Sequence, residues 1–286
     1  MNETPDGVRL EDWVGRRETA EDIITADPLA RLGAILDHDA PLPGADAAVS
    51  PGAHWLYFLN RARQSAIGPD GHPERGGFMP PVTLPRRMFA GARYEFRAPL
   101  AAGMTVSRAS EILSVKRKEG KSGALVFVTV RHDYQGADGA GLTEEQDIVY
   151  REAPQPGAPQ TAPPAAPADA TWSRSIWPDP VLLFRYSAVT FNGHRIHYDR
   201  DYCREVEGYP GLVVHGPLIA TYLMDLCAQE RPDAALRRFS FRAVSPLFDT
   251  GPFSVNAAPG DDGGWSLWAA NPDGGLAMEA SAAFAA

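Results

Sequence analysis

The feature that most constrains the fold is an approximate internal repeat on either side of a segment rich in alanine and proline. Residues 152–171 read EAPQPGAPQTAPPAAPADAT. Proline at this density is incompatible with helix and sheet interiors, so we predict an extended linker there. The chain is therefore expected to consist of two similar halves, residues 1–151 and 172–286, joined by the linker 152–171.

Motifs recur in the same order in both halves. The stretch YEFRAPLAAGMTV from Tyr94 in the first half corresponds to FSFRAVSPLFDTGPFSV from Phe239 in the second. Upstream of these, SPGAHWLYFL from Ser50 corresponds to YPGLVVHGPLIATYL from Tyr209. Each half thus contains an apolar stretch opened by Pro-Gly, then a loop, then a run of strands.

The apolar stretch of the second half has helical spacing. Leu218, Tyr222 and Leu226 recur at every fourth position, and Gly216-Pro217 suits a helix entry because the first turn does not need the missing N–H of proline. The same kind of central helix is predicted in the first half for the stretch containing Trp55, Leu56, Phe58 and Leu59.

Strands are predicted for β-rich runs that follow Gly/Asp turns. These are ALVFVTVRHDY from Ala124 and WSLWAA from Trp265. A long central helix followed by an antiparallel sheet is the element order of a hot-dog domain. The predicted fold is therefore α+β, a double hot-dog in which two antiparallel sheets each wrap a long helix.

Charge and cysteine content exclude several classes of protein. A net charge of −9 offers no basic stripe for nucleic acid. The two cysteines, Cys203 and Cys227, lack a paired spacing and are expected to be reduced packing residues. The acidic start is not a targeting signal, and apolar stretches fall short of the roughly 20 residues that span a bilayer. A cytoplasmic protein without nucleic-acid or membrane partners is expected.

Polar side chains suited to chemistry are concentrated between Phe184 and Tyr202, in FRYSAVTFNGHRIHYDRDY. Asn192 and His197 are five positions apart, and three of the seven histidines fall between positions 194 and 215. The stretch VVHGPL places His215 and Gly216 at the predicted helix entry.

This segment resembles a known family. Asn192-Gly193-His194-Arg195-Ile196-His197 is similar to the Asp-x-Asn-Pro-x-His signature of (R)-specific enoyl-CoA hydratases, the MaoC-like dehydratases, and VVHGPL resembles the start of their central helix. FRYSAVTFNGHRIHYD and FRAVSPLF most resemble the branch with mesaconyl-C4-CoA hydratase, itaconyl-CoA hydratase and mitochondrial 3-hydroxyacyl-thioester dehydratases. The resemblance covers nearly the whole chain, and the branch has a degenerate first half.

The resemblance implies a hydro-lyase acting on an acyl-CoA thioester. Its best substrates are mesaconyl-C4-CoA or itaconyl-CoA, hydrated to citramalyl-CoA. The alternatives are a 3-hydroxyacyl-CoA/ACP dehydratase of fatty-acid metabolism and a hot-dog acyl-CoA thioesterase, which generally needs a carboxylate where this chain has Asn192. A non-catalytic acyl-CoA-binding protein is a further alternative.

The catalytic residues are expected to be His197, Asn192 and Gly216. The pKa of a free histidine, about 6.5, suits a general base. Asn192 cannot titrate where the family has Asp, so we predict that it orients water and that His197 both accepts and returns the proton. The backbone N–H of Gly216, at a helix N-terminus, is predicted to stabilise the thioester oxygen, a contribution of roughly 3–4 kcal/mol in comparable sites.

Other residues of the segment are assigned to substrate binding. These candidates are Tyr186, Ser187, His194, Arg195 and His215. Tyr186 and Ser187 are read as part of a β-rich run, and His54 is expected to be structural. No metal is expected, because the histidines lack a carboxylate or thiolate partner set. No cofactor is expected either, since CoA belongs to the substrate.

The first half is predicted to contribute shape to the site. Its stretch from Glu18, ETAEDIITADPLARLGAILD, is predicted to be an amphipathic helix without a catalytic base. The loop from Gly68, GPDGHPERGGFMPPVTLP, is predicted to be an ordinary surface loop; the alternative is that it covers the acyl end of the active site. A single chain supplies a hot-dog pair, so a monomer and a homodimer of this pair are both possible.

Overall fold

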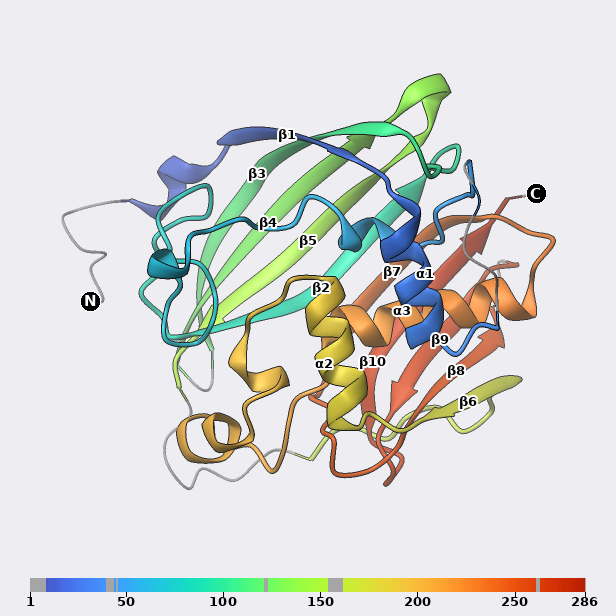
Figure 1. Ribbon diagram of the computed structural model, residues 1–286. Coiled ribbons are helices and arrows are strands. Elements are labelled where there is room, and N and C mark those ends of the chain that lie inside the picture. The colour runs from blue at the N-terminus through green and yellow to red at the C-terminus, as the bar shows by residue number, and fades with distance from the viewer. Residues whose placement is uncertain are drawn as a thin grey trace.

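In the computed structural model, residues 9–39, 44, 46–120, 123–153, 162–260 and 263–285 are described. Within these ranges, ten strands form one sheet in the order β1-β3-β4-β5-β2-β7-β10-β9-β8-β6, with every pairing antiparallel (Figure 1). The strands are β1 (Arg17–Ile23), β2 (Arg86–Phe96), β3 (Thr105–Gly120), β4 (Gly123–Gln135), β5 (Gly141–Arg151), β6 (Trp172–Ile176), β7 (Leu236–Ala243), β8 (Phe253–Pro259), β9 (Trp265–Ala270) and β10 (Leu276–Phe284).

The sheet consists of two halves with the same strand order. β1 to β5 form one half and β6 to β10 the other, and β2 pairs with β7 where they meet. In that pairing Tyr94 lies opposite Phe239, so the residues that begin the repeated sequence motif are register partners. The double hot-dog prediction is confirmed, with the difference that one continuous sheet replaces two separate ones. The strands predicted from Ala124 and Trp265 are β4 and β9.

The central helix of the second half is α3 (Gly216–Glu230), as predicted from its spacing. Gly216 and Pro217 form its first turn, and Leu218 and Leu223 are fully buried. The helix crosses the face of the red and orange strands, and α1 and α2 lie on the same side of the sheet (Figure 1).

The predicted central helix of the first half is wrong. It is replaced by a single 3-10 turn, η3 (Ala53–Leu56). The side chains of His54 and Trp55 bond to the buried carboxylate of Glu144, and Phe58 adopts a positive φ of 55° that ends helical geometry. A Cβ on Gly52 would lie 2.8 Å from the terminal methyl of Met224, so α3 already occupies the adjoining space.

Two further segments differ from the sequence prediction. The stretch predicted as one amphipathic helix from Glu18 is strand β1 followed by helix α1 (Ala26–Ile35), because the residues of β1 alternate between exposed and half-buried. The segment containing Tyr186 and Ser187, which we read as β-rich, belongs to helix α2 (Pro180–Val189). The carboxylate of Asp179 caps that helix by accepting the N–H of Leu182.

The predicted linker lies partly outside the described residues, which omit 154–161. Ala165 forms an isolated bridge with Gly275, and β6 begins at Trp172. Within the described ranges, no helix is long and apolar enough to cross a membrane.

Candidate active site

A cavity of about 1250 Å³ lies between the two halves. Its first-half wall contains His132, Gln146 and Ile148, which belong to strands β4 and β5. The second-half wall contains residues of α2, α3 and the loop between them.

His197 lies on this cavity at the end of a short 3-10 turn (Arg195–His197). Its Nδ1 lies 2.8 Å from the carbonyl oxygen of Val213, which places the ring hydrogen on Nδ1 and leaves Nε2 as a proton acceptor. Burial, followed by the neighbouring charge of His194, lowers the pKa of His197 to about 3. The ring is therefore neutral at pH 7, with Nε2 free to accept a proton.

His215 packs against one face of the His197 ring. The two rings stack with centroids 3.6 Å apart, and His215 Nε2 lies 2.8 Å from the hydroxyl oxygen of Ser187. His215 precedes α3 and is completely buried, so its side chain does not line the cavity, although Gly216 does. The N–H of Gly216 is in the first helical turn, where N–H groups have no intrahelical acceptor.

Asn192 lines the same cavity just beyond the end of α2. Its side-chain oxygen accepts the N–H of His194 at 3.0 Å, which fixes the turn between the two residues. The NH₂ group of Asn192 remains for a water molecule or substrate. Tyr186 and Ser187 also line the cavity, from α2.

The loop from Gly68 is a wall of the site, and the expectation of an ordinary surface loop is wrong. The carbonyl oxygen of Asp70 accepts the N–H of Arg195 at 2.9 Å. Gly71, at φ +89°, packs so closely that a Cβ there would lie 1.8 Å from the carbonyl oxygen of Gly193. The Arg195 guanidinium bonds to Pro69 and Asp199 and does not line the cavity, so this residue holds the loop in place.

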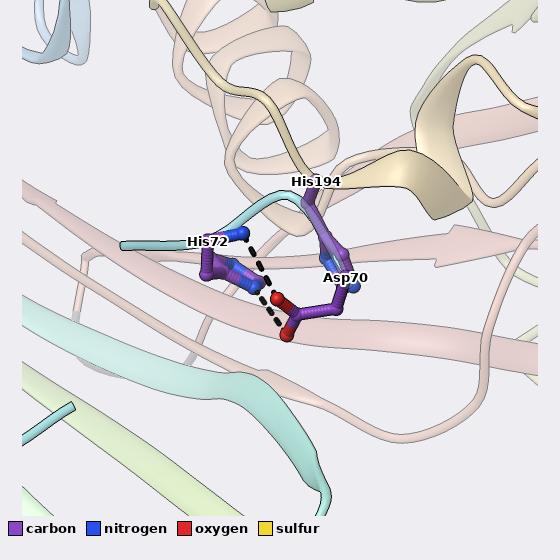
Figure 2. Close-up of side chains that lie close together, drawn as sticks. All are labelled: Asp70, His72 and His194. Carbon is purple, nitrogen blue, oxygen red and sulfur yellow. Dashed lines mark hydrogen bonds and ion pairs between the residues drawn. The ribbon is translucent and has the colours of Figure 1, made fainter. Parts of the chain in front are cut away.

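The same loop brings an acid–base pair that sequence reasoning missed. Asp70 and His72 meet His194 of the other half (Figure 2). A carboxylate oxygen of Asp70 lies 3.0 Å from His72 Nδ1, and the centroids of the His72 and His194 rings are 4.1 Å apart. The three groups offer ligand atoms within 4.8 Å of one another. The expectation of no metal rested on histidines without a carboxylate partner, and Asp70 supplies one.

Burial and charge set the protonation of this cluster. Burial alone would raise the pKa of Asp70, but the hydrogen bonds and charge of His72 lower it well below its usual range. Burial lowers the pKa of His194 to about 3, and it lowers the pKa of His72 against the opposing effect of Asp70. The Asp70 carboxylate is therefore ionised and both rings are neutral at pH 7.

Arg87 is a further cavity residue that the sequence did not single out. It is the second residue of strand β2 and is half-buried, and its side chain has no hydrogen bond or ion pair with any described residue. Its charge lowers the pKa of both His72 and His194, which places it near the histidine cluster.

A buried polar network stabilises the first half beside the cavity. The carboxylate of Glu144 is fully buried and receives hydrogen bonds from His54, Trp55, Tyr94, Tyr134 and Gln146. Burial would raise the pKa of Glu144, but the hydrogen bond and charge of His54 lower it to about 2. His54 therefore has the structural position that the sequence led us to expect.

With the fold and the cavity described, comparison with known proteins identifies the family. Residues 52–249 match the family model for hydroxyacyl-thioester dehydratase type 2. The chain belongs to this family. The mesaconyl-C(4)-CoA hydratase of Chloroflexus aurantiacus is 48% identical over 272 residues, covering 94% of this chain and 95% of that protein.

Solved structures agree on the fold. A MaoC-like dehydratase from Phytophthora capsici superposes with a TM-score of 0.70 at 11% identity, covering 95% of this chain and 96% of that one. A Mycobacterium tuberculosis protein with a double hot-dog fold superposes with a TM-score of 0.58 at 13% identity, covering 95% of this chain and 96% of that one. The chain thus has a double hot-dog fold and is a hydro-lyase of the hydratase/dehydratase class.

Proposed function

We propose that this hydro-lyase hydrates a C5-dicarboxylyl-CoA thioester, converting mesaconyl-C4-CoA or itaconyl-CoA to citramalyl-CoA. The chain is 48% identical to a mesaconyl-C(4)-CoA hydratase. The observation that carries the proposal is Arg87, a half-buried cavity cation without a counter-charge among the described residues. A substrate carboxylate would supply that charge.

The position of Arg87 fits the chemistry of mesaconyl-C4-CoA. In this substrate the free carboxylate is attached to the β-carbon, which is the atom that water attacks. A cation that binds the carboxylate must therefore lie close to the groups that transfer protons. Arg87 meets this condition, because its charge acts on His194, whose ring centroid is 5.4 Å from that of His197.

The cavity geometry supports the following catalytic roles. His197 takes a proton from water through its free Nε2 as the oxygen attacks the β-carbon. The NH₂ group of Asn192 orients the water, since its oxygen is occupied by the N–H of His194. The N–H of Gly216 stabilises the charge that develops on the thioester oxygen, aided by the dipole of α3.

Substrate binding is assigned to fewer residues than the sequence suggested. Tyr186, Ser187 and His194 contact the acyl group from the cavity wall. His215 and Arg195 act indirectly, by supporting His197 and the Gly68 loop. No cofactor other than the CoA of the substrate is assigned, and the enzyme is proposed to act in the cytoplasm.

Dehydration of a 3-hydroxyacyl thioester is the second candidate. The family match favours it. So does the apolar part of the cavity wall, which includes Phe89, Ile219, Leu247 and Met278 and would accept an aliphatic chain.

The ultraviolet absorbance of the enoyl thioester separates the candidates. Purified protein is incubated with mesaconyl-C4-CoA, itaconyl-CoA and crotonyl-CoA, and released thiol is followed in parallel. We expect absorbance loss with mesaconyl-C4-CoA and no free thiol. The double bond of itaconyl-CoA is not conjugated with the thioester, so its conversion to citramalyl-CoA is followed by chromatography. Turnover of crotonyl-CoA alone would favour the second candidate, and free thiol without hydration would establish a thioesterase.

A charge variant tests the role of Arg87. Arg87→Gln should raise KM for mesaconyl-C4-CoA by tenfold or more, because a charge-assisted pair is lost, and should leave crotonyl-CoA unaffected. Arg185→Gln is the matched control, since Arg185 is exposed on α2 and does not line the cavity. Equal effects of both variants would refute a carboxylate site at Arg87.

A further inference from the structure

Hydration requires a second proton transfer, which the sequence prediction gave to His197 itself, although the second half offers no separate acid for it. After water has added to the β-carbon, the α-carbon must receive a proton. Asn192 stands where the resembled family has an acid, and an amide cannot supply one. The other two histidines of the catalytic segment, His194 and His215, have no hydrogen bond to a carboxylate among the described residues.

We propose that Asp70 and His72 of the first half complete the site: His72 holds the proton removed from water and delivers it to the α-carbon, and Asp70 positions the His72 ring. This inference rests on the proposed hydration activity and assigns its second proton-transfer residue.

The geometry holds His72 in one tautomer. One carboxylate oxygen of Asp70 accepts the backbone N–H of His72, and the other lies 3.0 Å from Nδ1 of the same residue. The hydrogen of the neutral ring is therefore on Nδ1, and Nε2 is the proton-accepting atom. This is the arrangement in which a carboxylate orients a catalytic imidazole. His72 lines the cavity.

The position of His194 connects the two proton-transfer residues. Its ring centroid is 4.1 Å from that of His72 and 5.4 Å from that of His197. Each ring can pass a proton on after a small rotation or through one water molecule. The base at the β-carbon and the acid at the α-carbon are thus linked across the boundary between the halves.

Electrostatics favours His72 as the residue on which the proton rests. Four histidines line the cavity: His72, His132, His194 and His197. Among the described residues, His72 is the one of these four whose ring bonds to a carboxylate. A proton on His197 would be buried with no carboxylate bonded to the ring, and His194 lies within 4.8 Å of the Asp70 carboxylate without a hydrogen bond to it. A proton on His72, by contrast, lies 3.0 Å from that carboxylate.

The proposed sequence balances in protons and electrons. The water oxygen forms a bond to the β-carbon while one O–H bond breaks and its proton moves to Nε2 of His197. The π electron pair becomes the enolate of the thioester. The proton then passes by way of His194 to His72, and the enolate pair takes it to form the α-carbon–hydrogen bond. All three rings end in the neutral state in which they began.

A metal ion is the competing interpretation of the same cluster, since Asp70, His72 and His194 offer a carboxylate and two imidazoles. The contacts favour proton transfer, because both oxygens of Asp70 are engaged by His72. Metal content is therefore measured on the purified protein, and a stoichiometric transition metal that Asp70→Asn removes would overturn the proposal.

The first test separates the two proton transfers. The probe is methylsuccinyl-CoA, a saturated analogue that cannot add water but can exchange its α-hydrogen with D₂O. We expect His72→Gln to lose exchange and to lower kcat for hydration about 100-fold or more with little change in KM. His197→Gln should lose hydration yet retain exchange. Retained exchange and hydration in His72→Gln would overturn the proposal.

The second test concerns Asp70 and the control. Asp70→Asn keeps the shape of the pair and removes its charge, so exchange and kcat should fall about tenfold or more while thermal stability stays near that of the wild type. His38→Gln is the matched control: His38 Nε2 lies 2.8 Å from Asp225, in a His–Asp pair outside the cavity, and should leave both readouts unchanged.

The two hypotheses fail in different ways. A wild-type protein that hydrates neither C5-dicarboxylyl thioester refutes the proposed function. A wild-type protein that hydrates them, with exchange independent of His72 and Asp70, refutes this inference alone.

Discussion

Substituting Gly71 by alanine should separate the activity of this protein from its stability. Gly71 adopts φ +89°, and an added Cβ would lie 1.8 Å from the carbonyl oxygen of Gly193. That oxygen belongs to the backbone, so no side-chain rotation can relieve the contact. Because Gly71 lies between Asp70 and His72, any displacement of the loop moves both residues relative to the second half.

The size of the effect follows from these distances. Cβ atoms essentially never approach other heavy atoms more closely than 3.0 Å, so the loop must retreat by at least 1.2 Å (3.0 minus 1.8). A misplacement of about 1 Å can cost on the order of 100-fold in rate. The positive φ by itself costs about 1–2 kcal/mol with any L-residue other than glycine. We therefore expect a kcat near 1% of the wild type and a modest loss of stability.

Gly103 provides the matched control. It has φ +88°, and a Cβ there would meet no atom within 4 Å. Gly103→Ala should therefore lower the free energy of unfolding by a similar 1–2 kcal/mol and leave hydration unchanged. Urea unfolding and the absorbance assay on both variants give the comparison. Wild-type activity in Gly71→Ala would refute the argument that docking of the loop builds the site.

Three other predictions concern buried polar groups. His197→Gln should lower kcat by 100-fold to 10,000-fold with little change in KM, measured by the absorbance assay, and near-full activity would exclude His197 as the base. His194 and His197 have folded-state pKa values of about 3 against an unfolded value of 6.5, so the unfolded state binds more protons between these two pH values. The free energy of unfolding should therefore fall, for each ring, by about 1.4 kcal/mol per pH unit as the pH decreases from 6.5 towards 3. In urea titrations at pH 7 and pH 5, His197→Gln should remove about half of the pH dependence that these two rings cause. Glu144→Leu leaves several buried donors without their acceptor and should lower the free energy of unfolding by about 3–5 kcal/mol in urea titrations, and an unchanged midpoint would show that the network is not stabilising.

The sequence predicted the second half well because its signals are local. Leu218, Tyr222 and Leu226 repeat at helical spacing, and Gly216-Pro217 fits the first turn, so α3 could be recognised from the chain alone. The repeat also indicated the relation between the halves, because similar motifs form the paired strands β2 and β7.

The first half was harder to predict because its structure depends on distant contacts. Trp55 and Leu56 look like part of a helix, but the side chains of His54 and Trp55 bond to Glu144, about 90 residues away, and α3 takes the neighbouring space. A hydrophobic pattern indicates that a residue is buried, but it does not indicate which residues it packs against.

The catalytic pair from the first half was missed for a similar reason. Asp70 and His72 lie in a loop rich in glycine and proline, and nothing in the local pattern shows that it folds against residue 193. The spacing Asp-Gly-His was an available signal, because a carboxylate two residues before a histidine can bond to its ring and backbone, as it does here. The close approach of Gly71 to Gly193 is visible only in three dimensions.

The pairing of Tyr94 with Phe239 has a consequence for how this enzyme can diverge. In a hot-dog dimer of identical chains, symmetry makes every substitution appear twice, at equivalent positions. Here the two partners are encoded separately, so Arg87 or His72 can change without altering the other half of the sheet. Arg87 of the first half can change with the acyl group while the second half retains His197, Asn192 and Gly216, so a new acyl specificity needs a change in only one copy of the repeat.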